Sequence, residues 1–221
     1  MKIGVIVAME KEYQRVKAML DDTQRDDVIL HTCGIGKVNA AIGATKLIRE
    51  QHVDAIISTG VAGGAFTSLS IRDVVVATET CYHDVYCGGE VAYGQVIGCP
   101  PRFEADPLLL QKALDLHLDN YSALGSQNLK LHYGLTVTGD WFVDTREKMY
   151  EILSHFPNAM AVDMESAAIA HACAIEGIPF LSFRVISDIP LNGNNGPEYI
   201  DFWDTIADDS FIVTKALLQS L

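Results

Sequence analysis

Two carboxylates follow apolar segments of this chain, at positions where they could do acid and base chemistry. Glu165 follows the apolar segment Ala159–Val162, and Asp188 ends the buried-looking run that begins at Phe180. A carboxylate at the carboxyl edge of a sheet can accept hydrogen bonds from two neighbouring hydroxyls, as on a ribose. The alternatives are ordinary ones: a solvated carboxylate that favours a helix dipole at Glu165, and a local cap at Asp188.

Two glycine-containing segments could bring a ligand close to the backbone. Gly34-Ile-Gly-Lys37 lacks the third glycine of a dinucleotide fingerprint, because Asn39 stands there, and it lacks the Gly-Lys-Ser/Thr of a Walker loop. It therefore indicates a strand-to-helix turn. Gly60-Val-Ala-Gly-Gly64 follows a predicted strand and permits close approach of a ligand, although a plain tight turn explains it equally well.

The elements that must position these residues alternate between strands and helices. Short β-branched runs predict strands, and apolar residues at helical spacing predict helices. The predicted strands are Ile3–Ala8, Val28–Thr32, Ala55–Thr59, Val74–Thr78, Leu131–Thr138, Ala159–Val162 and Phe180–Ile186. The predicted helices are Glu10–Leu20, Val38–Glu50, Asp106–Leu116, Thr145–Leu153, Glu165–Glu176 and Tyr199–Leu218. Tyr82–Phe103, rich in Gly, Pro and aromatics, predicts loops at a site or an interface.

This alternation predicts an α/β fold: a three-layer sandwich around a mixed, mostly parallel sheet with helices on both faces. With 221 residues, 49% of them hydrophobic, and no linker or repeat, the chain 1–221 is expected to form one domain. The net charge of −13 argues against nucleic acid and anionic membranes as partners. No apolar run reaches membrane-spanning length and no signal-peptide pattern is present. Five cysteines without a C-x-x-C pair suit free thiols in the cytoplasm.

Taken together, these segments resemble the bacterial 5'-methylthioadenosine/S-adenosylhomocysteine nucleosidases of the purine nucleoside phosphorylase superfamily. The match covers nearly the whole chain. The matching segments are Met1–Glu12, Gly34–Val38, Thr59–Gly64, Tyr82–Asp84, Tyr93–Gln95, Gly98–Pro100, Thr138–Asp140, Met164–Glu165 and Ile186–Asp188. An ordered series of segments is far more specific than any single one, so a nucleoside phosphorylase-like fold is expected.

The resemblance implies a role for each candidate residue. Glu12 would be the base that deprotonates the attacking water, and Asp188 would protonate N7 of the departing adenine. Glu165 would bind the ribose hydroxyls. The resemblance further implies a substrate-binding set made of Met9, Ala62, Gly63, Phe142, Val143, Met164, Arg184 and Ser187. Of these, Phe142 would stack on adenine, Val143 would read the base edge, Met164 would pack under the sugar and Arg184 would orient the water.

The chemistry explains these residue types. Breaking an N-glycosidic bond builds positive charge on the ribose and negative charge on the base, so an acid must reach the purine while carboxylates face the sugar. Such hydrolysis needs no cofactor and no metal, and the sequence has no spaced His/Cys/Asp cluster for one. The expected partner is a small nucleoside, in methionine salvage, and a homodimer is expected because the family closes each pocket with a loop of the other subunit.

The sequence departs from the family pattern at four places. Val61 replaces a serine, and Asp163 replaces a glutamate before Met164-Glu165. The segments Val85–Ala92 and Asn192–Pro197 also differ, and both border the expected pocket for the 5' substituent. Adenine release is therefore better supported than the identity of the 5' group.

Three other functions remain open. A nucleoside phosphorylase shares the fold, but Glu12 would repel phosphate and no pair of arginines is present to hold it. A futalosine hydrolase would need basic residues around a carboxylate-bearing 5' group, and this acidic chain offers few. A nucleoside-binding protein without catalysis is the third alternative. It is disfavoured because Glu12, Glu165 and Asp188 are all retained.

Overall fold

The computed structural model describes residues 1–21, 25–116, 129–193, 195–205 and 211–221. Its centre is a mixed sheet in which most strand pairs are parallel. The strands are β1 Ile3–Val7, β2 Val28–Thr32, β3 Ala55–Gly64, β4 Val74–Tyr82, β5 Phe103–Glu104, β6 Leu131–Thr138, β7 Ala159–Asp163 and β8 Phe180–Asp188. The helices are α1 Glu10–Asp21, α2 Lys37–Gln51, α3 Pro107–Leu114, α4 Arg146–His155, α5 Ser166–Glu176, α6 Asn195–Thr205 and α7 Ile212–Ser220, with a 3-10 turn at Pro190–Asn192.

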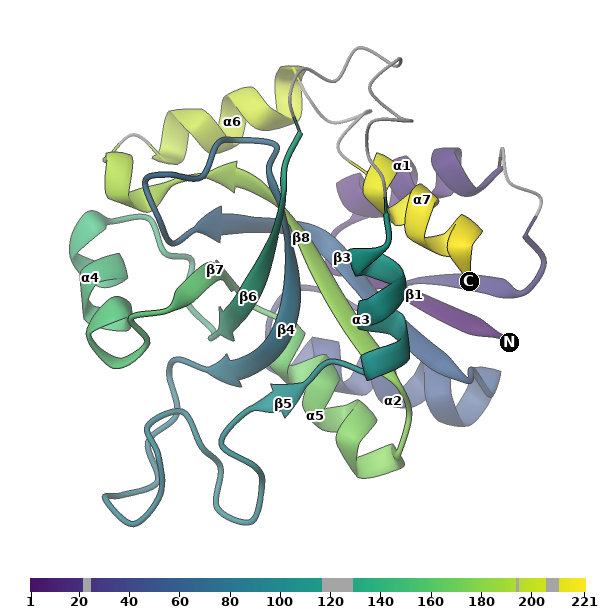
Figure 1. Ribbon diagram of the computed structural model, residues 1–221, viewed down its shortest axis with the longest axis horizontal. Helices are drawn as coiled ribbons and strands as arrows, with labels where there is room; N and C mark the ends of the chain where they lie inside the picture. The colour runs from purple at the N-terminus through teal and green to yellow at the C-terminus, as the bar shows by residue number, and fades with distance from the viewer. Residues whose placement is uncertain (22–24, 117–128, 194, 206–210) are drawn as a thin grey trace.

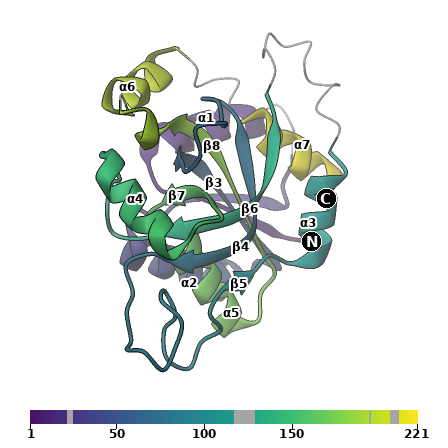
Figure 2. The ribbon, with the colours of Figure 1, turned by 60° about the vertical axis from the view of Figure 1, so that its left-hand side comes forward.

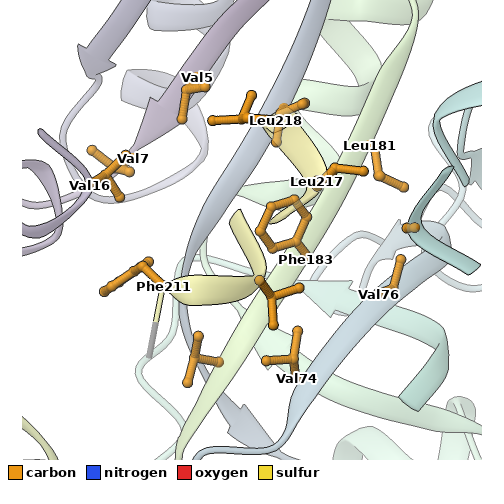
Figure 3. Packing of buried hydrophobic residues seen from close by; sticks show 14 of the residues in the cluster. Val5, Val7, Val16, Val74, Val76, Leu181, Phe183, Phe211, Leu217 and Leu218 are labelled. Atoms are coloured by element: carbon orange, nitrogen blue, oxygen red, sulfur yellow. The ribbon is translucent and has the colours of Figure 1, made fainter. Parts of the chain in front are cut away.

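Helices cover both faces of the sheet, so the predicted α/β fold is confirmed (Figures 1 and 2). Alternate residues of a strand point to opposite faces. On β1, Val5 and Val7 pack with α1, α3 and α7, while Ile6 packs with α2 and α5. Figure 3 shows the first of these cores, in which Phe183 of β8 lies among side chains from the sheet and from α7.

Part of the sheet closes on itself, which the sequence pattern did not predict. β3 pairs with β8, β8 with β4, β4 with β6, β6 with β7, and β7 with β3. The pairs β3–β7 and β4–β8 that complete this ring are antiparallel. Closure brings the carboxyl ends of β3, β7 and β8 together, although these strands are far apart in the sequence.

Two predicted boundaries were wrong. The Gly60–Gly64 segment is not a turn after the strand but the second half of β3, because Gly63 and Gly64 pair with β7 while Gly60 and Val61 pair with β8. The predicted helix Tyr199–Leu218 is replaced by α6, which ends at Thr205, and α7, which begins at Ile212. Residues 206–210 of that prediction lie outside the described part of the chain.

The predicted loop segment between Tyr82 and Phe103 is confirmed. Residues 83–102 form neither helix nor strand and project at the lower left of Figure 1. Asp106 and Thr145 are helix N-caps, since their side chains accept hydrogen bonds from backbone N–H groups of α3 and α4. The five cysteines are all unpaired. No helix in the described ranges is long and apolar enough to cross a bilayer.

Candidate active site

One pocket gathers the residues that the sequence nominated. It lies where β3, β7 and β8 end, and it is bounded by the start of α1, the segment before α4 and the first half of α6. Its lining includes every candidate except Arg184: Met9, Glu12, Ala62, Gly63, Phe142, Val143, Met164, Glu165, Ser187 and Asp188. The sequence did not nominate seven further lining residues as site residues, which are Ala8, Ile35, Val61, Trp141, Val162, Asp163 and Tyr199.

Glu12 is held by backbone groups. It lies in the first turn of α1 and is 2% exposed. Its Oε2 accepts hydrogen bonds from the N–H groups of Ala8 (2.9 Å) and Met9 (3.0 Å), and its Oε1 accepts one from Val61 (2.9 Å). Burial raises the pKa of Glu12, while the bond from Val61 and the charge of Arg184 act in the opposite direction. The carboxylate is thus fixed in place without losing its ability to take a proton.

Gly60 makes this arrangement possible. Its φ of 152° lies in a region that L side chains rarely adopt, and a Cβ there would lie 2.5 Å from Glu12 Oε1. The serine that Val61 replaces in the family would have supplied a hydroxyl. In this chain the backbone N–H of Val61 still binds Glu12, so the substitution removes a side-chain hydroxyl but leaves the backbone contact.

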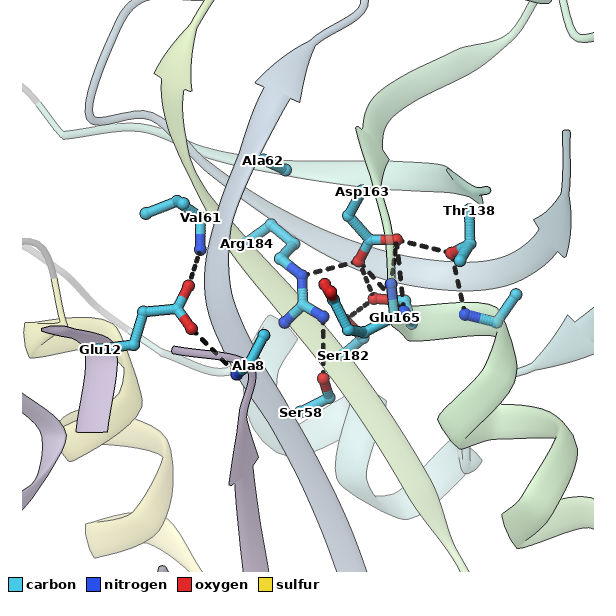
Figure 4. A network of polar contacts seen from close by, with 12 residues as sticks. Ala8, Glu12, Ser58, Val61, Ala62, Thr138, Asp163, Glu165, Ser182 and Arg184 are labelled. Carbon is cyan, nitrogen blue, oxygen red and sulfur yellow. Dashed lines mark hydrogen bonds and ion pairs between the residues drawn. The ribbon is translucent and has the colours of Figure 1, made fainter. Parts of the chain in front are cut away.

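A second network surrounds Asp163 and Arg184 (Figure 4). Asp163 accepts hydrogen bonds from Thr138 Oγ1 (2.6 Å), from Ser166 Oγ and from Arg184 Nε (2.7 Å). Arg184 Nη2 donates to Ser58 Oγ at 2.9 Å. Asp163 is shorter than the usual glutamate, yet it reaches all these partners because it ends β7 directly beside β6 and α5.

Arg184 lies behind the pocket rather than in its lining. It is 3% exposed, and its Nη1 is buried with no hydrogen-bond partner among the described residues. The negative charges of Asp163, Glu165 and Glu12 raise the pKa of Arg184 against the opposing effect of burial. A buried guanidinium N–H without a partner is costly, so a polar ligand atom or a water beside Nη1 would stabilise the site.

Glu165 is the N-cap residue of α5, but its side chain does not cap the helix. Its Oε1 instead accepts a hydrogen bond from the N–H of Gly36 at 2.9 Å, across 129 residues of sequence. Burial, followed by the nearby charge of Asp163, raises the pKa of Glu165 to about 7. The carboxylate is 7% exposed and lines the pocket, so the solvated-carboxylate alternative is wrong.

The Gly34–Lys37 turn holds this donor in position. Gly36 has a φ of 92°, and a Cβ there would meet Asp140 Oδ1 at 2.9 Å. Lys37 N donates to the same Asp140 oxygen at 2.7 Å, and Lys37 Nζ binds both oxygens of Asp84 at 2.8 and 2.7 Å. These contacts fix the turn to the ends of β4 and β6. The turn therefore holds the backbone N–H of Gly36 in position to donate to Glu165.

A β-bulge directs Asp188 into the pocket. Ala62 pairs with Ile186 and Gly63 pairs with Asp188, so Ser187 is the extra residue on β8. Asp188 is 3% exposed, and its Oδ1 accepts a hydrogen bond from Ser187 Oγ at 2.7 Å. Directly after it, the N–H of Ile189 donates to Glu198 Oε2 of α6 at 2.8 Å. The side chain of Asp188 is therefore a buried, oriented member of the pocket rather than a solvent-exposed cap.

Aromatic side chains form the open side of the pocket. Phe142 and Trp141 are 48% and 52% exposed, and Phe142 meets the ring of Tyr199 edge-on with centroids 5.6 Å apart. Within the described ranges, no three His, Cys, Asp or Glu side chains are grouped so as to hold a metal ion. Buried carboxylates face an apolar, aromatic slot, an arrangement that suits acid and base chemistry on a flat heterocycle attached to a polar ring.

Comparison with known proteins agrees with this geometry. Residues 2–219 match the model of the phosphorylase superfamily. The chain therefore belongs to this superfamily of nucleoside-cleaving enzymes.

Solved structures narrow the assignment. A 5'-methylthioadenosine/S-adenosylhomocysteine nucleosidase from Neisseria meningitidis, in complex with methylthio-immucillin-A, is 34% identical, with a TM-score of 0.87 and 100% of each chain covered. The nucleosidase from S. pneumoniae with a transition-state inhibitor is also 34% identical, with a TM-score of 0.87 and coverage of 100% and 99%. That of Colwellia psychrerythraea, in complex with adenine, is 33% identical, with a TM-score of 0.87 and coverage of 100% and 96%. This chain is a member of the 5'-methylthioadenosine/S-adenosylhomocysteine nucleosidase family.

Proposed function

We propose that this chain hydrolyses the N-glycosidic bond of 5'-methylthioadenosine and S-adenosylhomocysteine and releases adenine. The observation that carries the proposal is the meeting of Glu12, Glu165 and Asp188 in one pocket of a chain that matches the nucleosidases over its full length. Residues 1–221 would act as one catalytic domain, in the cytoplasm, on a small nucleoside and without a cofactor.

Glu12 is the proposed base. Its carboxylate is oriented by three backbone N–H groups, and its raised pKa favours acceptance of a proton from the attacking water. The unpartnered Nη1 of Arg184 supplies a donor for that water from the other side. The water oxygen attacks C1' of the ribose as the bond to adenine breaks, and the proton moves to Glu12.

Asp188 is the proposed acid. Ser187 donates to Oδ1 and orients the carboxyl group, which would carry a proton to N7 of adenine. Glu165 would accept hydrogen bonds from the ribose hydroxyls. Phe142 would stack on the base and Val143 would read its edge, while the remaining candidates, Met9, Ala62, Gly63, Met164 and Ser187, would pack around the nucleoside.

An assay of the sugar product tests this function against its rivals. Purified protein is incubated with methylthioadenosine with and without phosphate. Hydrolysis gives free methylthioribose in both cases, whereas a phosphorylase gives the sugar 1-phosphate only with phosphate. Futalosine is supplied as a second substrate in a parallel incubation. Release of hypoxanthine from futalosine alone would mean a futalosine hydrolase, and release of no base from either substrate would mean a binding protein.

We further propose a homodimer. Val38 on α2 and Ile175 on α5 are 69% and 72% exposed and line a groove between the two helices and the loop after β4. Ile42 on α2 is also exposed, at 51%. Ile35 is 51% exposed and lines the catalytic pocket. We call Ile35, Val38, Ile42 and Ile175 together the apolar stripe. A second copy of the chain would bury the stripe and close the edge of the pocket.

Light scattering tests the dimer. A Val38→Asp variant is expected to become a monomer at micromolar concentration and to lose activity. Leu108→Asp is the matched control, because Leu108 is 79% exposed on α3, away from the stripe. A fully active wild-type monomer would contradict the proposal.

A further inference from the structure

Tyr199 is the lining residue whose chemistry the proposed reaction does not use. It lies on α6 and is half-buried at the pocket. The preceding residue, Glu198, fixes this part of the helix by accepting the hydrogen bond from the N–H of Ile189, one residue after Asp188. Tyr199 is thus carried by an element whose position is tied to the end of β8.

Two other aromatic rings hold the ring of Tyr199. Phe142 lies edge-on at 5.6 Å between centroids with an interplanar angle of 72°, and Trp203 lies edge-on at 6.2 Å with an angle of 76°. Edge-to-face pairs at these distances are attractive and directional. The orientation of the phenol ring is therefore defined.

The hydroxyl of Tyr199 donates to a thioether sulfur. Its oxygen lies 3.8 Å from Sδ of Met9, a distance suited to a weak hydrogen bond to sulfur. The backbone N–H of Met9 donates to Glu12 at 3.0 Å, so the backbone of Met9 is fixed beside the proposed base. The Met9 side chain itself has three rotatable bonds and can move aside without disturbing that contact.

We infer that Tyr199 is a specificity-determining residue, which donates its hydroxyl to the thioether sulfur of the 5' substituent in place of Met9 Sδ. The inference rests on the proposed function. A ribose whose hydroxyls bind Glu165 would place its 5' carbon near Met9 and Tyr199, which line the same pocket, and the sulfur of the substrate is bonded to that carbon. One thioether replaces another, so the hydroxyl keeps a partner of the same chemistry in the free and the bound enzyme.

The surroundings of Tyr199 keep its hydroxyl protonated, so it can donate a hydrogen bond. Burial is the largest cause that raises the pKa of the Tyr199 hydroxyl, a side-chain hydrogen bond with Trp203 acts in the opposite direction, and the negative charges of Glu12, Asp188 and Glu165 add to the effect of burial. The phenol is therefore protonated at every pH at which the enzyme would work. A substrate with a methylene group in place of sulfur offers no acceptor, so its binding displaces Met9 from the hydroxyl without replacing the lost interaction.

The test compares methylthioadenosine with the analogue in which CH2 replaces the sulfur, in wild-type protein and in Tyr199→Phe. The ratio of kcat/KM for the sulfur substrate over the carbon analogue is expected to fall about 3-fold to 10-fold in the variant, the effect of one hydrogen bond to a weak acceptor. The phenyl ring keeps the contacts with Phe142 and Trp203. Tyr150→Phe is the matched control, since Tyr150 is 59% exposed on α4, and it should leave the ratio unchanged.

An unchanged ratio in Tyr199→Phe would overturn the inference while leaving the proposed function intact. Equal losses on both substrates would overturn it as well, because they would mean that the hydroxyl serves only packing. Failure of the wild-type protein to release adenine from either substrate would instead refute the proposed function, and the inference with it.

Discussion

The floor and the rim of the pocket are built in opposite ways. We define the floor as Glu12, Asp163, Glu165, Arg184 and Asp188, and the rim as Ile35, Trp141, Phe142 and Tyr199. Each floor residue is at most 7% exposed. Glu12, Asp163, Glu165 and Arg184 are hydrogen-bonded to partners from distant parts of the chain, and Asp188 accepts a hydrogen bond from the adjacent Ser187. Ile35, Trp141 and Phe142 of the rim are about half exposed, and the rim is held mainly by ring contacts.

The difference follows from what each region would bind. Charge that develops in a transition state is stabilised best by groups that are already fixed in a site with little water, so the floor must be rigid. An aromatic base and a 5' substituent are recognised by apolar contact, which tolerates small shifts. Substitutions in the floor should therefore lower kcat, whereas substitutions in the rim should change KM or selectivity.

The largest effect is expected for Asp188→Asn. The amide keeps the size of the side chain but cannot deliver a proton to N7, so adenine release should almost vanish. Nitrophenyl ribosides, whose leaving group departs without help, should still be cleaved. A variant that loses both activities equally would show that Asp188 holds the strand end, and one that loses neither would rule out the mechanism.

Glu12→Gln is expected to lower kcat by about 10²-fold to 10⁴-fold, the range for loss of a positioned general base. KM should stay near the wild-type value, because the three backbone contacts do not involve substrate. Glu10→Gln on the exposed side of the same helix is the control. If only KM rises, Glu12 binds substrate and does not act as the base.

The pH profile should distinguish floor from rim. Burial raises the pKa of Glu12 above its ordinary value and that of Glu165 to about 7, and both groups must be ionised to work. As the pH falls through 7 Glu165 takes up a proton, so kcat/KM should fall about tenfold for each pH unit when one proton is involved. Substitutions in the rim should leave this acidic limb of the kcat/KM profile unchanged, whereas Glu165→Gln should move the limb to a different pH.

Glu165→Gln should also weaken discrimination between ribose and 2'-deoxyribose substrates. A carboxylate accepts from both hydroxyls, whereas an amide offers one acceptor and one donor, so the kcat/KM ratio should fall about 10-fold. Steady-state kinetics on matched ribo and 2'-deoxy substrates measures this ratio. A ratio equal to that of the wild type would remove Glu165 from ribose binding.

The smallest effect is expected in the rim. Phe142→Leu keeps apolar bulk but loses the flat ring, and a stacking contact contributes about 0.5–1.5 kcal/mol beyond burial. KM for methylthioadenosine should rise about 3-fold to 10-fold with little change in kcat. A fall in kcat as large as that of Glu12→Gln would contradict the division of the pocket into floor and rim.

The sequence by itself determined the elements and the identity of most pocket residues. Apolar periodicity is local, so the strands that end near Glu165 and Asp188 and the helix that contains Glu12 were predicted close to their observed bounds. Asp188 stands at the end of β8, as expected, and Glu165 is the N-cap of α5, one residue before the observed start of the helix. The family pattern supplied Phe142, Val143 and Met164, which do line the pocket.

Only the tertiary structure decided how these residues meet. The glycines of β3 form strand because β7 and β8 lie beside them, and a local pattern cannot reveal partners that come from nearly 100 residues or more further along the chain. The bulge at Ser187, the N–H of Gly36 on Glu165 and the hydroxyl of Tyr199 on Met9 depend on the same long-range pairing. Hydrogen bonds and ring contacts between distant segments leave no periodic signature, because each is set by the relative placement of whole elements.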